Sequence, residues 1–314
     1  MVTHKKFDLI GYGAVSVDDL LYVPNYPIAG SKIEVHHRER FGGGLTGTAL
    51  VAAARLQTKT AYFGTLGDDE LSAFTRNEFL DDQIDISQII NKENARPIHS
   101  TIIIDQQNGE RTIFYSLENF NLISSDEIPN TLCHQANYLF IDSYVLNNFP
   151  TLISMAEESN TVIIADIETE RVTQFPNEFA AIHYLILNRD LASMITGKKE
   201  PSDILNHLET PNRYCSVITQ GDQGCWFKTH YEPAYYLPAF PVKVVDTTGC
   251  GDVFHGAFSA ALIHGKDHHQ AVIWASAAAA IKATQHGGRK GIPDLPTLSR
   301  FIEEHPVNSI KVAK

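Results

Sequence analysis

The segment 245–258, Val-Asp-Thr-Thr-Gly-Cys-Gly-Asp-Val-Phe-His-Gly-Ala-Phe, holds residues whose types and spacing could transfer a phosphoryl group. Two glycines, Gly249 and Gly251, come directly before an amphipathic helical pattern. Because backbone N–H groups at a helix N-terminus have no intrahelical partner, this turn predicts an anion site. Asp252 falls in the first turn of that helix, where a carboxylate can reach both a phosphoryl group and an incoming hydroxyl. Helix capping is the alternative role for Asp252, and local spacing alone does not separate the two.

The elements that must hold this turn are short apolar runs alternating with helical patterns. Strands are predicted at 8–14, 100–105, 111–116, 138–142, 161–166, 184–188 and 216–220. Helices are predicted at 46–56, 69–80, 151–158, 202–208, 253–265 and 271–284. Strands that are apolar throughout suit a parallel sheet covered on both faces by crossover helices. The pattern therefore predicts an α/β fold.

Two polar, extended segments interrupt this alternation and predict a second, smaller sheet. The stretch 19–40 contains Pro24 and Pro27, which do not suit a helix. The strands predicted at 101–105 and 111–116 flank Gln-Asn-Gly-Glu at 107–110, where Asn-Gly favours a tight hairpin turn. We expect one domain, 1–314, with a lid formed by about 15–40 and 98–117. Its apolar alternation could pair with a second copy, so a homodimer is also expected.

Composition excludes several classes of function. The chain has 314 residues, of which 43% are apolar and 20% charged, as in ordinary globular proteins. Its formal charge of −12, with dispersed Lys and Arg, argues against nucleic-acid binding, so any phosphate site must be local. The four cysteines lack metal-site spacing, and no apolar stretch is long enough to cross a membrane. We expect a cytoplasmic protein.

The motif Asp246-Thr247-Thr248-Gly249-Cys250-Gly251-Asp252 resembles the second signature of the ribokinase-like (PfkB) carbohydrate kinases, with Cys250 in place of the usual Ala. Other matching segments follow in order: Asp18, Pro27, Gly30, 41–49 with 52–56, 64–69 and 218–225. The resemblance covers nearly the whole chain. It implies a ribokinase-like three-layer α/β/α sheet, mostly parallel, with a small β-sheet lid. It also implies ATP-dependent phosphorylation of a hydroxyl on a small sugar, with ATP and Mg²⁺ as cofactors.

The resemblance implies roles for individual residues. The backbone amides of Gly249, Cys250 and Gly251 would form the anion hole, and Asp252 would accept the hydroxyl proton. Acceptor contacts are implied for Asp18, Gly43 and Gly44, and nucleotide contacts for Asn188, Thr219, Gly221 and Gly224. Oxygens of Asp246 and Thr248 would hold a monovalent cation such as K⁺. Asp166, at the carboxyl end of a predicted strand, is a further acceptor candidate, with a loop cap as the alternative.

Departures from the family pattern concern the acceptor. Thr48 stands where the family places an Asn that often binds a sugar hydroxyl. Lys32 and the segment 287–293, Gly-Gly-Arg-Lys-Gly-Ile-Pro, resemble the branch that contains sulfofructose kinase. Lys32 would then face an anionic group on the acceptor, and a solvated lid residue is the alternative. Arg289 is expected near the nucleotide or the cation. A sugar phosphate, a sulfosugar or a nucleoside therefore remains an open alternative to a neutral sugar.

Two other functions compete with a kinase. Gly11-Tyr12-Gly13 after the first strand suggests a dinucleotide-binding oxidoreductase, but Ser16 replaces the third glycine and no helix follows before Pro24. A non-catalytic nucleotide or sugar sensor could share the fold. The intact Asp252 and its glycine-rich turn favour an enzyme. His255, one helical turn later, is expected either to contact the site or to pack inside the fold.

Overall fold

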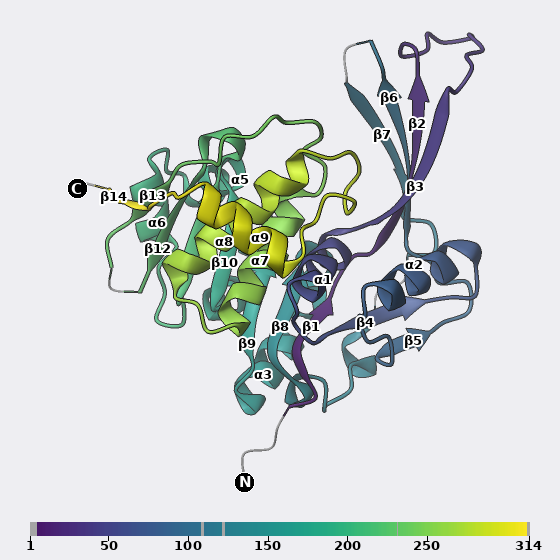
Figure 1. Ribbon diagram of the computed structural model, residues 1–314. Helices are drawn as coiled ribbons and strands as arrows, with labels where there is room; N and C mark the ends of the chain where they lie inside the picture. The colour runs from purple at the N-terminus through teal and green to yellow at the C-terminus, as the bar shows by residue number, and fades with distance from the viewer. Residues whose placement is uncertain (1–4, 108–109, 121–122, 231, 313–314) are drawn as a thin grey trace.

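The computed structural model describes residues 5–107, 110–120, 123–230 and 232–312. Within them, ten strands form one large sheet (Figure 1). In spatial order they are β5 (Ile89–Asn91), β4 (Thr60–Leu66), β1 (Phe7–Tyr12), β8 (Ala136–Asp142), β9 (Val162–Asp166), β10 (Tyr184–Asn188), β11 (Cys215–Thr219), β12 (Cys225–Thr229), β13 (Tyr235–Leu237) and β14 (Ile310–Lys311). Pairs from β5 to β11 are parallel, and pairs from β11 to β14 are antiparallel. The predicted α/β class is confirmed.

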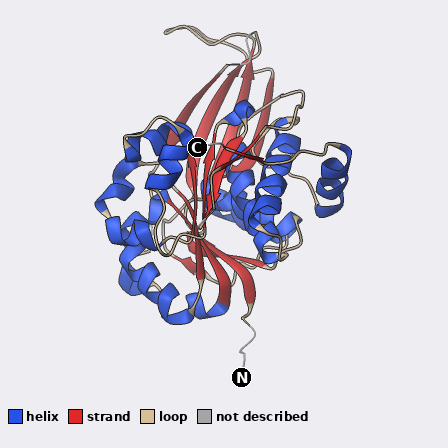
Figure 2. Ribbon diagram, turned by 90° about the vertical axis from the view of Figure 1, so that its left-hand side faces the viewer, coloured by secondary structure: helices blue, strands red, loops and turns tan. Residues whose placement is uncertain are grey.

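Helices cover both faces of this sheet, as Figure 2 shows. One layer contains α1 (Leu45–Arg55), α7 (Cys250–Ile263), α8 (His268–Ala283) and α9 (Leu295–Glu304). The other contains α3 (Phe149–Ser159), α4 (Pro176–Ala181), α5 (Arg189–Thr196) and α6 (Pro201–His207). Successive strand residues point to opposite layers, so Ile163 and Ile164 belong to different apolar cores. This three-layer α/β/α arrangement explains why the strands are apolar throughout.

One further helix and several short 3₁₀ segments complete the described elements. α2 (Glu70–Asp81) contacts the small sheet described below, and its Phe79 packs into the α1 and α7 core. The 3₁₀ segments are Ser125–Glu127, Cys133–Gln135, Ser143–Asn148, Glu170–Gln174 and Gly221–Gln223. Among the described residues, no helix combines the length and apolarity that crossing a membrane requires.

A four-stranded sheet projects from the main body (Figure 1). Its order is β3 (His37–Gly43), β2 (Ser16–Val23), β6 (Ile98–Asp105) and β7 (Arg111–Ser116). β6 and β7 pair in antiparallel register, as the predicted hairpin requires, while its turn residues Asn108 and Gly109 lie outside the described residues. Leu20, Tyr22 and Ile102 form a small core of their own on this sheet. Its role as a lid stays a prediction.

Candidate active site

The turn before α7 has the backbone that an anion site needs. Gly249 is the N-cap, with a φ of 74°, and a Cβ there would lie 2.9 Å from the carbonyl oxygen of Gly288. Only glycine suits this position. Gly251 is exposed, and a Cβ on it would meet nothing within 4 Å, so open space lies over the helix N-terminus. The Cys250 N–H donates to Thr247 O at 3.2 Å, which leaves Gly251 as the first amide directed to a ligand.

Asp252 is the third residue of α7 rather than its N-cap. The residue as a whole is half-buried. Burial of its carboxyl group raises the pKa of Asp252 well above the usual range, and the charges of Glu168 and Asp142 raise it further. The charge of Arg289 opposes this shift. A carboxylate with a raised pKa is better suited to accept a proton from a hydroxyl.

Two buried carboxylates stand beneath this turn, at paired positions on β8 and β9. Asp142 is fully buried and accepts from Ala14 N at 2.7 Å and from Thr46 Oγ1 at 2.8 Å. It therefore joins the end of β1 to α1. Asp166 is 3% exposed, and its Oδ2 lies 3.4 Å from Nδ1 of His255. Sequence reasoning gave Asp142 no role, because its partners are distant in the chain.

His255 is a buried packing residue that also supports the turn. Its Nδ1 lies 2.8 Å from the carbonyl oxygen of Gly251. Burial lowers the pKa of His255 to about 4, so the ring is neutral near pH 7 and its Nδ1–H donates to that carbonyl. His255 therefore packs inside the fold, as one expectation had it, and also contacts the backbone of the site at Gly251, as the other had it.

The predicted acceptor residues of β2 and β3 lie together. The Asp18 carboxylate accepts from Ser16 Oγ at 3.1 Å, and a Cβ on Gly43 would lie 2.4 Å from Asp18 Oδ2. Gly44 has a φ of 85°, and a Cβ there would lie 2.6 Å from Ala14 O. Burial raises the pKa of Asp18. Lys32 is exposed between β2 and β3 and forms no hydrogen bond or ion pair with the described residues.

Arg289 occupies the space behind these residues. It is 4% exposed, and its guanidinium donates to Gly43 O at 2.7 Å and to Glu78 Oε2 at 3.0 Å. A longer contact of 3.4 Å reaches Oγ1 of Thr48, which is itself buried. The loop that carries Arg289 does lie beside the predicted cation residues, because the Gly287 N–H donates to Asp246 Oδ2 at 2.8 Å, but the Arg289 side chain itself turns toward β3 and α1. Thr48 therefore supports Arg289.

The predicted nucleotide residues gather at the carboxyl ends of β10 and β11. Asn188 and Thr219 are paired across these strands, and the Asn188 side chain caps α5 by accepting from Leu191 N at 2.9 Å. Gly224 has a φ of 85°, and a Cβ there would lie 2.1 Å from Leu237 O. Gly221, with a φ of 53°, belongs to the same turn. Open α/β sheets bind ligands at this edge.

Comparison with known proteins decides the family. Residues 7–295 match the pfkB family carbohydrate kinases. The chain belongs to this family. It is 26% identical over 323 residues to a 5-dehydro-2-deoxygluconokinase of Clostridium tetani, covering 96% of this chain and 94% of that protein. It is also 26% identical over 299 residues to a ribokinase of Staphylococcus aureus, covering 92% and 97%. These matches identify an ATP-dependent carbohydrate kinase.

A solved E. coli structure in complex with ATP and Mg²⁺ has the same fold as this PfkB kinase. The TM-score is 0.80 at 16% identity, and the match covers 95% of this chain and all of that one. The ribokinase-like fold predicted from the motifs is therefore confirmed. The narrower resemblance to the sulfofructose kinase branch stays a prediction.

In this PfkB kinase the oxygens predicted to bind K⁺ already have protein donors. The Asp246 carboxylate accepts from the N–H groups of Thr248 and Gly287, each at 2.8 Å. Arg111 of β7 donates to Thr248 Oγ1 at 2.7 Å and lies 3.4 Å from Asp246 Oδ1. Lys282 of α8 donates to the Asp246 carbonyl at 2.9 Å. With the positive charges of Arg111 and Lys282 already on these oxygens, this donor set does not fit a bound monovalent cation, which both charges would repel.

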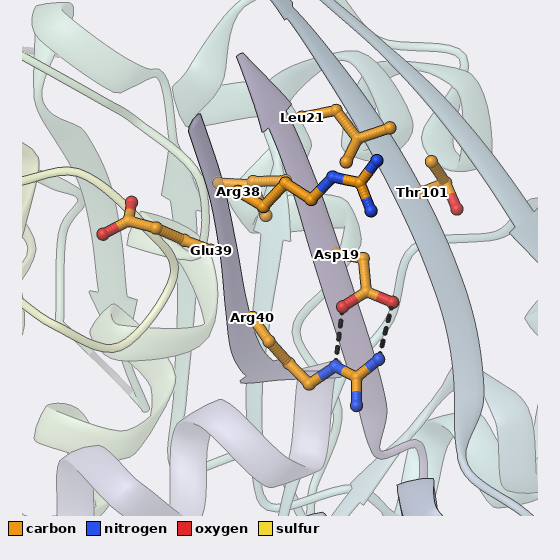
Figure 3. Close-up of a pocket in the computed structure, with 7 residues that line it drawn as sticks. Asp19, Leu21, Arg38, Glu39, Arg40 and Thr101 are labelled. Atoms are coloured by element: carbon orange, nitrogen blue, oxygen red, sulfur yellow. Dashed lines mark hydrogen bonds and ion pairs between the residues drawn. The ribbon is translucent and has the colours of Figure 1, made fainter. Parts of the chain in front are cut away.

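A cavity of about 450 Å³ lies on the opposite face of the small sheet from Asp18. Figure 3 shows Asp19 in this cavity, joined to the guanidinium of Arg40 by two contacts. Successive residues of a strand point to opposite faces, so Asp19 turns away from the acceptor residues. The cavity is lined by Asp19, Leu20, Leu21, Arg38, Glu39, Arg40 and Thr101. It is separate from the candidate active site.

Proposed function

We propose that this carbohydrate kinase transfers the γ-phosphoryl group of ATP to a hydroxyl of a small sugar or sugar derivative, with Asp252 as general base. The observation that carries the proposal is the place of Asp252, in the first turn of α7 beside the open space over Gly251. Asp18 and Arg289 are close enough for their charges to influence the pKa of Asp252. The Asp252 carboxylate therefore lies between the predicted acceptor residues and the predicted anion site.

The chemistry follows from this geometry. Asp252 takes the proton as the acceptor oxygen forms its bond to phosphorus, while the bond to the bridging oxygen breaks and ADP leaves. The backbone amides of Gly249 and Gly251 stabilise the charge of the transferring group, whereas the predicted part of Cys250 is not supported because its N–H donates to Thr247 O. Mg²⁺ bound with ATP would neutralise phosphate charge, and its ligands come mainly from the nucleotide and water. Thr219, Gly221 and Gly224 form the nucleotide side, next to the helix cap made by Asn188.

We assign acceptor binding to Asp18 and to the backbone of Gly43 and Gly44. The two oxygens of Asp18 can accept from vicinal hydroxyls. Thr48 and Asp166 support the site indirectly, because Thr48 contacts Arg289 and Asp166 lies against His255.

A narrower form of this proposal is that the acceptor is anionic and that Lys32 contacts its charged group when the small sheet closes. Lys32→Ala should then raise the Michaelis constant for that acceptor roughly 10-fold, and an unchanged constant would favour a neutral sugar.

Asp252→Asn tests the proposed base. We expect a fall in kcat of roughly 10²- to 10⁴-fold with little change in ATP binding, because the amide cannot accept the proton. ADP release is measured over neutral sugars, sugar acids, sugar phosphates, a sulfosugar and nucleosides. Asp203→Asn, at an exposed position of α6, is the matched control. Turnover near that of the wild type would remove Asp252 from its role.

We further propose a cytoplasmic homodimer, formed through the edge of the small sheet. β7 is an edge strand, and Ile113, Phe114 and Tyr115 are 48%, 52% and 64% exposed. An exposed apolar edge strand is a surface that another chain can cover. Light scattering of wild type and Phe114→Lys tests this proposal. A monomeric wild type at micromolar concentration would contradict it.

The cytoplasmic part of the proposal is supported by the cysteines, which are free thiols and so suit a reducing compartment.

A further inference from the structure

Lys282, in the last turn of α8, is fully buried. Lysine is almost never fully buried unless its ammonium has a partner. Here Nζ donates to the backbone carbonyl of Asp246 at 2.9 Å. The ammonium also lies at the C-terminal end of a helix, where the macrodipole favours positive charge. None of the steps proposed above uses this lysine.

The contacts of α8 place the Lys282 ammonium behind the anion turn. Cys250, the first residue of α7, directs its Sγ to the carbonyl of Ala279 at 3.6 Å. Ala279 and Lys282 are three residues apart and so share one face of α8. The N–H groups of Val245 and Asp246 donate to Ala283 O at 2.8 and 3.1 Å. The end of α8 therefore supports the chain just before Gly249.

Protein donors already contact the oxygens that were predicted to bind a monovalent cation. The Asp246 carboxylate and the Thr248 hydroxyl accept from backbone N–H groups and Arg111, and the Asp246 carbonyl accepts from Lys282. An ion entering here would have to displace these donors. The buried ammonium already provides one fixed positive charge, and it pays no cost of binding from solution.

We propose that Lys282 is a positioning residue that replaces a bound monovalent cation, holding the Asp246 carbonyl and adding fixed positive charge behind the anion turn. Phosphoryl transfer then needs no K⁺. The proposal rests on the proposed function, since the charge acts on the γ-phosphoryl group held at that turn. Arg111 supplies a second protein cation from the small sheet.

The wild-type enzyme gives the first test. Its kcat and its Michaelis constant for ATP are measured at equal ionic strength in K⁺, Na⁺ and tetramethylammonium chloride. Its melting temperature is measured in the same salts. We expect rates within about 2-fold across the three salts and no melting shift specific to K⁺, since the oxygens are occupied. Several-fold stimulation by K⁺ would overturn the proposal. This arm needs no variant to fold.

Substitutions give the second test. Lys282→Met removes the charge and nearly keeps the volume, and we expect kcat to fall roughly 10-fold or more, less than the loss of a direct oxyanion donor. Lys282→Ala should lose as much but recover partly in NH₄⁺ or K⁺, because the truncation leaves room for an ion. Lys243→Met, an exposed lysine shortly before the turn, is the control. An unchanged kcat in Lys282→Met would contradict the role.

Melting temperature separates this proposal from the proposed function. Lys282→Ala should gain thermal stability in NH₄⁺ or K⁺ relative to tetramethylammonium, whereas the wild type and Lys282→Met should not. That readout needs no acceptor. Absence of turnover with every acceptor would therefore refute the proposed function alone. Absence of any ion-specific stabilisation in Lys282→Ala would refute the replacement of a cation by Lys282.

Discussion

Replacement of Arg289 by Met should weaken both the fold and the recognition of the acceptor. The guanidinium donates to the buried Gly43 carbonyl at 2.7 Å, a charge-assisted hydrogen bond that contributes about 1.5–3 kcal/mol. Its contact with Glu78 counts for less, because the Glu78 side chain is 30% exposed and water can replace the donor. The guanidinium also lies 5.7 Å from the Phe79 ring centroid, which adds about 0.5–1 kcal/mol. We expect the free energy of unfolding to fall by about 2–4 kcal/mol.

The kinetic effect of Arg289→Met should appear in the Michaelis constant for the acceptor and in the pH dependence of kcat, because the Arg289 charge also lowers the pKa of Asp252. Gly43 and Asp18 lose the charge that holds them, so the Michaelis constant for the acceptor should rise roughly 10-fold while that for ATP stays the same. Urea unfolding and steady-state kinetics measure the two effects. Arg289→Lys should recover only part of the loss, since an ammonium keeps the charge but lacks the planar fork that reaches Gly43, Glu78 and Thr48 together. Arg300→Met, at an exposed position of α9, is the control. An unfolding free energy within about 0.5 kcal/mol of the wild type would refute this reasoning.

Three further outcomes are expected. Burial and neighbouring carboxylates raise the pKa of Asp252, so as the pH is lowered kcat should begin to fall at a pH well above the ordinary pKa of a carboxyl group. A kcat that stays constant down to about pH 4.5 would contradict this. A raised folded-state pKa costs stability as pH rises above the unfolded value, so Asp252→Asn should be more stable than wild type near pH 8, with the advantage shrinking toward pH 4 in thermal melts. Gly224→Ala should lower the free energy of unfolding by about 1–3 kcal/mol and raise the Michaelis constant for ATP but not that for the acceptor. Gly197→Ala is the control: its Cβ would lie in open space, so it should lose only the smaller free energy that a positive φ costs a non-glycine residue.

Much of the main sheet could be predicted, because its strands are apolar throughout. The predictions at 138–142 and 184–188 coincide with most or all of β8 and β10. Sequence reasoning missed β4, although every residue of Thr60–Leu66 is buried. Its two threonines and Gly64 weaken the apolar signal, and the burial comes from β1 and the helices that cover it. β12 was missed for the related reason that Lys228 makes it half polar.

The site divides in the same way between local and distant contacts. The glycine turn at the start of α7 and the place of Asp252 in its first helical turn could be predicted from sequence because they are consecutive residues, while phosphate binding there stays a prediction. The Arg289 bond to Gly43 joins residues 246 apart, and the Lys282 bond to Asp246 joins residues 36 apart. No local spacing encodes such pairs. The sequence therefore predicted where a phosphate could bind, whereas only the structure shows that the charged side chains of Arg289 and Lys282 lie near that turn.

The positions of these cations explain how an acidic chain could bind a phosphoryl donor that carries several negative charges. With a net charge of −12, the protein has no general attraction for ATP. Lys282 and Arg289 provide buried positive charge from α8 and the loop after it, so their charge is present before any ligand arrives. Arg111 is different, because β7 carries it on the small sheet and its contacts with Asp246 and Thr248 form only while that sheet stays near α7. Movement of the sheet would therefore change the charge at the anion turn, and closure over the acceptor would also complete the electrostatic environment for phosphoryl transfer.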